Sequence, residues 1–196
     1  MNSLLIGFLL KPAVKFTLSY EQLITSIIEK DPERYLVLET VRSIDLPDWL
    51  IAAGFVRNAV WDYIYGIKTD LNDIDVIYFC SLDISIERDI EIQKSLLALE
   101  PKLPWSVKNQ ARMHYKNGDA AYSSSKDAMS YWPEKQTSIG VKLDDQNVIE
   151  VQHCFDLALQ FSGKVNHNPN REKHIFKKRV MQKSWQGIWP KLEIET

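Results

Sequence analysis

Hydrophobic and polar positions follow one another along the chain in blocks, and the block over residues 49–79 is the most informative. Its first apolar run, Trp49–Ala52, predicts a short strand that ends in a tight turn at Ala53-Gly54. Apolar residues then recur at helical spacing over 55–66, where the final glycine is a typical helix end. The β-branched run at 74–77 predicts a second, buried strand. The block therefore has the order strand, turn, helix, loop, strand.

Similar patterns predict the elements around this block. Ser19 with Gln22 forms a capping box, and Asp31 before a proline is a typical helix start. A turn signal at 144–147 joins two β-rich segments into a hairpin. Together the patterns predict a mixed α/β (α+β) fold, with helices over 20–30, 32–46, 85–99, 125–132, 155–161 and 171–189, and with further strands over 105–115, 137–143 and 148–151.

Two aspartates, Asp73 and Asp75, stand at the start of the second strand of the block. Because side chains on a strand alternate between faces, the two carboxylates project together, roughly 7 Å apart along the backbone, and Ile74 points the other way. Two carboxylates on one face of a strand suit hard divalent cations such as Mg²⁺, and nucleotidyl transfer uses this arrangement. The pattern predicts a catalytic, metal-binding pair. The alternative is a pair that only caps or solvates the strand end.

The turn before the helix is the second candidate for chemistry. Backbone N–H groups at Ala53 and Gly54, at the start of a helix, attract a triphosphate. Arg57 and Asn58 lie in the first helical turn, where a guanidinium can add charge-assisted contacts to phosphate oxygens. Each feature also has a plainer interpretation, since such a turn is common and a lone arginine usually forms a surface ion pair. Their order and spacing favour the functional interpretation.

Composition places few limits on this picture. The 196 residues, 45% of them hydrophobic, suffice for one domain or for one domain with a small helical appendage. The net charge of −2 gives no global attraction to nucleic acid. Cys80 and Cys154 match no metal spacing, so we expect thiols and a cytoplasmic location. The apolar segment Met1–Leu10 is too short for a membrane span and lacks a basic leader, so no membrane partner is predicted.

Four motifs together resemble one family of small bacterial predicted nucleotidyltransferases: AGFVRNAVWD at 53–62, LNDIDVIYF at 71–79, WSVKNQARMH at 105–114 and AMSYWPE at 128–134. The resemblance spans about residues 20–193, within the superfamily typified by DNA polymerase beta. The segment 53–58 also resembles the head domain of class II CCA-adding enzymes. The resemblance implies a nucleotidyltransferase fold, with a small, largely antiparallel sheet flanked by helices. It also implies Mg²⁺- or Mn²⁺-dependent transfer of a nucleotidyl group from an NTP to an unidentified acceptor.

The chain departs from this pattern in two places. The superfamily often has a third acid on the strand predicted at 105–115, where this sequence offers the amides Asn109 and Gln110. Glu150 is a backup candidate for that carboxylate, and Lys108 and Arg112 are candidates for phosphate contacts. The superfamily signature has a glycine at the first position of the turn, where this sequence has Ala53. These departures keep open an alternative, a non-catalytic nucleotide-binding or partner-binding protein on the same fold.

Basic residues gather in the predicted helix at 171–189, which suits RNA or phosphate and equally suits an ordinary helix with a basic exposed side. An RNA partner therefore remains open. For a role like that of CCA-adding enzymes, we expect a partner subunit to replace their long helical body. We expect a head domain at 46–152, preceded by an extension and helices at 1–45 and followed by a helical extension at 153–196.

Overall fold

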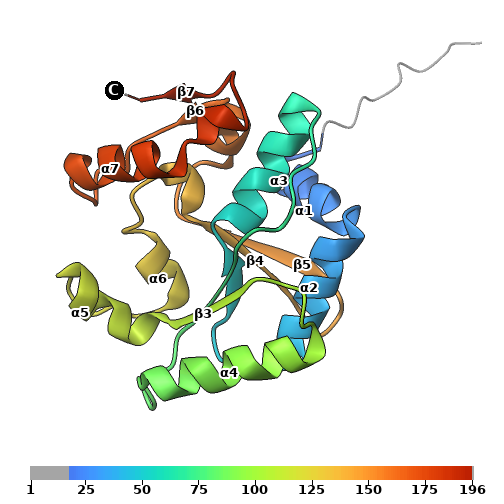
Figure 1. Ribbon diagram of the computed structural model, residues 1–196, viewed down its shortest axis with the longest axis vertical. Coiled ribbons are helices and arrows are strands. Elements are labelled where there is room, and N and C mark those ends of the chain that lie inside the picture. Colours follow the sequence, from blue (N-terminus) through green and yellow to red (C-terminus); the bar gives the residue numbers. More distant parts are fainter. Residues whose placement is uncertain (1–17, 196) are drawn as a thin grey trace, which may run out of the picture.

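The computed structural model describes residues 18–195, so the apolar segment at 1–10 lies outside the described residues (Figure 1). Helices and strands alternate along the chain with short connections between them. Single 3-10 turns lie at Gln110–Arg112, Lys135–Thr137, Leu157–Phe161 and Trp185–Gly187. The elements are α1 (Tyr20–Glu29), α2 (Pro32–Arg42), β1 (Leu50–Ala52), α3 (Gly54–Tyr65), β2 (Ile74–Tyr78), α4 (Ile86–Leu99), β3 (Trp105–Asn109), α5 (Met113–Asn117), α6 (Ser125–Met129), β4 (Ile139–Leu143), β5 (Ile149–His153), β6 (Lys164–Val165), α7 (Lys173–Lys183) and β7 (Glu193–Ile194).

The predicted helix starts are confirmed by their caps. The Ser19 side chain accepts a hydrogen bond from the Gln22 backbone N–H, and the Gln22 side chain accepts one from the Ser19 backbone N–H. The two bonds complete the capping box of α1. Asp31 caps α2, whose first residue is Pro32. Helix α3 ends at Gly66, which has the left-handed conformation (φ 67°) that glycine adopts without strain. Short-range sequence signals thus set where these helices begin and end.

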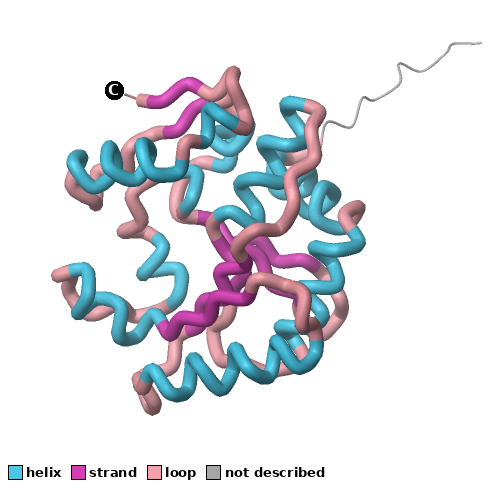
Figure 2. The backbone as a smooth tube through the Cα atoms, in the orientation of Figure 1, coloured by secondary structure: helices cyan, strands magenta, loops and turns pink. Residues whose placement is uncertain are grey.

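The main sheet has five strands in the order β3-β2-β1-β4-β5 (Figures 1 and 2). Strands β2 and β3 are parallel and are joined by α4, whereas the other neighbouring strands are antiparallel. This confirms the mixed, largely antiparallel sheet. Across it, Asp75 lies opposite Ala52, and Ala52 lies opposite Gly140. The strand with the acid pair is therefore second from one edge.

The two faces of the sheet have different surroundings. Ile74, Val76 and Tyr78 pack into the main core with residues of α1, α2, α3 and α4. On the opposite face, Ala52 and Ile77 belong to a small cluster that includes Met129 of α6. Because side chains alternate along β2, Asp75 lies on this second face, away from the main core. The helices leave room there for a cleft.

The C-terminal segment packs against helix α3. Trp61 of α3 makes edge contacts with Trp185 and Trp189, at ring-centroid distances of 5.7 and 5.0 Å. The Trp189 indole also donates a hydrogen bond of 3.0 Å to Asp62. The parallel pair of β6 and β7, which the sequence did not predict, returns the chain to the same cluster. These contacts fix the position of α7.

Several predicted elements are shorter in the structure, and two of them end six residues early. The strand predicted to Tyr115 ends at Asn109, because the Asn109 side chain accepts a hydrogen bond of 3.0 Å from the Ala111 backbone and starts a 3-10 turn. The helix predicted to Trp189 ends at Lys183, where Ser184 turns into the left-handed conformation (φ 46°). Within residues 18–195, helices are too short or too polar to cross a membrane.

Candidate active site

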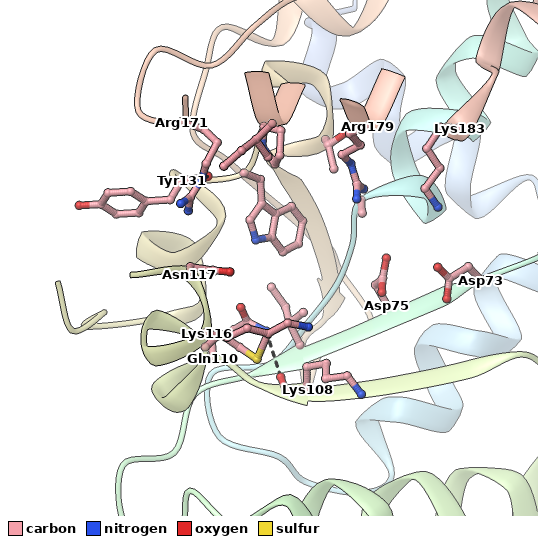
Figure 3. Close-up of a pocket in the computed structure, with 17 residues that line it drawn as sticks. Asp73, Asp75, Lys108, Gln110, Lys116, Asn117, Tyr131, Arg171, Arg179 and Lys183 are labelled. Atoms are coloured by element: carbon pink, nitrogen blue, oxygen red, sulfur yellow. Dashed lines mark hydrogen bonds between the residues drawn. The ribbon is translucent and has the colours of Figure 1, made fainter. Parts of the chain in front are cut away.

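A cleft of about 530 Å³ lies on the second face of the sheet (Figure 3). Its floor is formed by β2 and β3, one wall by α5 and the segment after α6, and the other wall by α7. The side chains that line it include two acids and five basic residues. The full lining is Ala53, Asp73, Asp75, Ile77, Lys108, Gln110, Met113, Lys116, Asn117, Tyr131, Trp132, Pro133, Thr137, Arg171, Ile175, Arg179 and Lys183.

The predicted acid pair lies together at the floor of this cleft. Asp73 precedes β2 and is exposed, whereas Asp75 is half-buried. Burial raises the pKa of the Asp75 carboxyl to about 6, and the neighbouring Asp73 charge adds to the rise. The charges of Arg179, Lys183 and Arg57 oppose this effect. Among residues 18–195, neither carboxylate accepts a hydrogen bond or forms an ion pair. The pair therefore lacks a partner that would neutralise it.

This donor set fits a hard divalent cation. Two carboxylates without protein partners supply the oxygen ligands that Mg²⁺ prefers, and Mg²⁺ typically takes its remaining ligands from water and phosphates. No group of three or more histidine, cysteine or acidic side chains able to hold a metal occurs among the described residues. The site therefore fits a cation held by two carboxylates and completed by a phosphate-bearing ligand.

The turn between β1 and α3 opens onto the same cleft through Ala53. Its backbone N–H donates to the Ile139 carbonyl (3.0 Å), and it gives α3 no side-chain cap. The first amide groups of α3 are consequently available to an anion, which the helix dipole also attracts. Gly54 begins this helix, as predicted. The turn and the acid pair thus lie on one cleft.

Ala53 has backbone angles (φ 58°, ψ −119°) that glycine adopts readily and alanine does not. We expect Ala53→Gly to raise the free energy of unfolding by about 1 kcal/mol, because relief of strain exceeds the extra entropy of the unfolded chain. Urea unfolding measures this difference. Ala59→Gly, in the middle of α3, is the matched control and should lower stability by about 1 kcal/mol or more. A loss of stability in both variants would contradict the strain.

Arg57 lies beneath the cleft instead of lining it. The residue is 4% exposed, and its guanidinium packs against the rings of both Trp61 and Trp185, 4.9 and 4.5 Å from their centroids. It donates to the Thr137 hydroxyl (2.7 Å) and to the Asn58 side chain (2.9 Å). Burial lowers the pKa of Arg57 to about 10, so the residue stays charged at neutral pH. The sequence predicted a direct phosphate contact for Arg57 and Asn58, but the structure ties the two to each other.

The candidates on and after β3 separate into two groups. Lys108 and Gln110 line the cleft. Asn109 is buried instead, and its amide holds the backbone of Cys80 and Asp83. Arg112 forms an ion pair with Asp89 beside α4. The predicted alternation of faces along 105–115 fails for Arg112 because the strand ends before it.

Glu150 lies far from the acid pair. It is on the edge strand β5, where it forms an ion pair of 3.0 Å with Lys142. Two strands separate β5 from β2, so roughly 14 Å of sheet lies between them. Glu150 therefore does not supply the missing carboxylate in this arrangement. The neighbour of Asp75 on β3 is Ser106, which carries no charge.

The sequence indicated that the basic residues of α7 suit RNA or phosphate, but it did not place them at the acid pair. Arg179 and Lys183 extend from this helix toward Asp75 and Asp73 (Figure 3). Arg171, just before α7, also lines the cleft and pairs with Asp119 at 2.6 Å. Ile175, Arg179 and Lys183 recur every four residues, which places them on one helical face. That spacing was the available signal, but only the tertiary fold shows what the face contacts.

Comparison with known proteins agrees with this geometry. A family model described as nucleotidyltransferase matches residues 39–194. A similar solved structure is an NMR structure described as revealing a CCA-adding enzyme head domain. Its sequence is 31% identical to this chain, and the two structures match with a TM-score of 0.80. The match covers 89% of this chain and 95% of that chain. Curated proteins show no similar sequence.

Full-length CCA-adding enzymes share the fold at lower identity. The complex of one with ATP is 14% identical (TM-score 0.57), and the Thermotoga maritima enzyme complexed with tRNA is 15% identical (TM-score 0.54). Each comparison covers 88% of this chain but only 43% and 42% of those chains, so this chain spans less than half of their length. On the evidence of the family model and the 31% identical relative, this protein belongs to the nucleotidyltransferase family and has the fold of a CCA-adding enzyme head domain.

Proposed function

We propose that this protein transfers a nucleotidyl group from an NTP to an acceptor in a metal-dependent reaction that releases pyrophosphate. The observation that carries the proposal is the Asp73–Asp75 pair, which lies without protein partners at the floor of a basic cleft. A structural acid pair in a folded protein is normally paired or hydrogen-bonded, because isolated like charges destabilise the fold. This pair is instead poised for a cation.

The surrounding residues suggest how the substrate is held. Asp73 and Asp75 would hold Mg²⁺ or Mn²⁺, which supplies charge neutralisation for the transferred phosphate. The start of α3 at Ala53 and Gly54 would face the triphosphate, with Lys108 on the opposite side of the acid pair. An acceptor oxygen then bonds to the α-phosphorus in line, and the bond to the bridging oxygen breaks, leaving its electron pair on pyrophosphate.

Binding provides the direct test. Isothermal titration with Mg²⁺ and each of the four NTPs should give saturable binding to the wild type and none to the Asp73→Ala/Asp75→Ala variant. The matched control is Asp145→Ala/Glu150→Ala, which removes two exposed acids of the β4–β5 hairpin. The control should bind like the wild type. Equal binding by the wild type and the Asp73→Ala/Asp75→Ala variant would place the nucleotide elsewhere.

A non-catalytic nucleotide-binding or partner-binding role is the second candidate. It is favoured by the absence of a third carboxylate beside the pair among the described residues, and by the strained alanine at position 53. Binding alone does not separate the two. Pyrophosphate release with pools of RNA, protein and small-molecule acceptors would exclude the non-catalytic candidate.

RNA is a proposed acceptor class, because α7 adds exposed Lys177 and Lys178 beside the cleft. Failure to retain tRNA at low salt would exclude tRNA as the acceptor.

We also propose that the reaction takes place in the cytoplasm. In this proposal residues 46–152 form the head domain and residues 153–196 form an extension. Helix α7 of that extension forms one wall of the cleft.

A further inference from the structure

Arg179 is oriented across the cleft by a buried acid. Its Nε lies 2.9 Å from Oε1 and 3.1 Å from Oε2 of Glu134, to which it donates a hydrogen bond. The Glu134 side chain is 0% exposed, whereas that of Arg179 is 35% exposed and lines the cleft. Among the described residues, only Glu134 accepts a hydrogen bond from Arg179. The two Nη groups therefore remain free on the side that extends toward Asp75 (Figure 3).

The backbone of Glu134 is held by two hydrogen bonds. Its backbone carbonyl accepts one from the Thr137 N–H (3.1 Å) and one from the Ser138 hydroxyl (3.2 Å). A buried carboxylate is tolerated only when cations compensate its charge. Glu134 pairs with Arg179, and its charge also acts on the buried Arg57, whose pKa it raises while Arg179 lowers it. One acid with two arginines nearby leaves a net positive charge in this part of the cleft wall.

The end of α7 is fixed by the same cluster. Trp185, two residues after the end of α7, packs its ring 4.5 Å from the buried Arg57 guanidinium. The helix therefore cannot shift without disturbing contacts beneath the cleft. An arginine held through Nε presents a planar pair of Nη donors, which matches two phosphate oxygens.

We infer that Arg179 contacts the phosphates of the bound NTP and that Glu134 is a positioning residue that holds the Arg179 guanidinium in place. The inference rests on the proposed function and assigns to α7 the role that the sequence suggested for Arg57. Arg57 contributes positive charge beneath the cleft, and Arg179 donates the hydrogen bonds to the phosphate oxygens.

The test measures the preference for NTP over NMP by titration in the presence of Mg²⁺. Arg179→Ala should weaken NTP binding about 10- to 100-fold, because charge-assisted hydrogen bonds to phosphate are lost. NMP binding should change less than about threefold. Lys94→Ala removes one exposed positive charge from α4, outside the cleft, and should leave both affinities unchanged. Arg179→Lys should restore only part of the preference, because it lacks the paired donors.

Glu134→Gln tests the positioning role. It should weaken NTP binding about threefold to tenfold in the wild-type background and have no further effect in the Arg179→Ala background, because the two residues act as one unit. Equal effects in both backgrounds would overturn the role of Glu134. If Glu134→Gln does not fold, Arg179→Ala and Arg179→Lys still decide the role of Arg179.

Inorganic tripolyphosphate, titrated without metal, separates failure of this inference from failure of the proposed function. Tripolyphosphate binding that depends on Arg179 supports the inference even if the wild type binds no NTP. NTP binding that depends on Asp73 and Asp75, with the NTP preference unchanged in Arg179→Ala, overturns the inference and leaves the proposed function intact. A wild type that binds neither ligand overturns both.

Discussion

Replacing Asp75 by asparagine is expected to stabilise the metal-free protein at neutral pH and to remove its metal-dependent nucleotide binding. Burial raises the pKa of Asp75 to about 6 in the folded protein, well above the 3.8 of an unperturbed aspartate. Ionising such a group costs the fold about 3 kcal/mol, and partial exposure reduces this to about 2 kcal/mol. Asparagine keeps the shape and removes the charge. Loss of one carboxylate ligand should weaken Mn²⁺ binding on the order of 100-fold.

The pH dependence of the stability difference identifies its cause. Because folding raises the pKa of Asp75, its favourable contribution to the wild type is complete below about pH 4 and is lost as the pH rises through 6. The variant should therefore match the wild type near pH 4 and exceed it by about 2 kcal/mol at pH 7. Urea unfolding at both pH values measures this, and Mn²⁺ titration measures the ligand loss. A stability gain that is the same at pH 4 and pH 7 would contradict the electrostatic explanation.

Replacing Arg57 by lysine is expected to lower the free energy of unfolding by about 2–3 kcal/mol, although the charge is kept. Lysine lacks the planar guanidinium that donates to both Thr137 and Asn58 and packs against the rings of Trp61 and Trp185. The midpoint of thermal unfolding should fall by about 5–10 °C. Circular dichroism measures the midpoint, and tryptophan fluorescence should report the altered stacking.

The control for this variant is Arg88→Lys. The Arg88 side chain is 37% exposed, and its Nη1 lies 3.9 Å from Oδ2 of Asp83. Its stability should change by less than about 0.5 kcal/mol. Because Arg57 lies beneath the cleft, NTP affinity of folded Arg57→Lys should stay within about threefold of the wild type. Unchanged stability together with a tenfold or larger loss of NTP affinity would show that Arg57 is a direct phosphate ligand.

Short-range signals carried most of what the sequence predicted correctly. Alternation along β2 put Asp73 and Asp75 on one face, and the capping residues Ser19 and Asp31 set two helix starts. These features depend on neighbours within a few residues, which a sequence displays directly. The strand–turn–helix–strand order of β1, α3 and β2 was predictable for the same reason.

Long-range contacts account for what was missed. Nothing near Arg57 in sequence shows that Trp185 will cover it, and nothing near Arg179 shows that Glu134 will orient it. Asn109 lies in β3 as predicted, but the strand ends there instead of at Tyr115, and the Asn109 side chain bonds to loop backbone at Cys80 and Asp83. In each case a partner distant along the chain outweighs local propensity.

The cleft combines acids from β2 with a wall from α7, which lies near the other end of the chain (Figure 1). Synthesis on the ribosome proceeds from the N-terminal side, so Asp73 and Asp75 leave the exit tunnel well before Arg179 and Lys183. A nascent chain that already displays its acid pair therefore has no enclosed pocket for a substrate. The cleft is complete only after the tryptophans that follow α7 have been synthesised and have docked on α3.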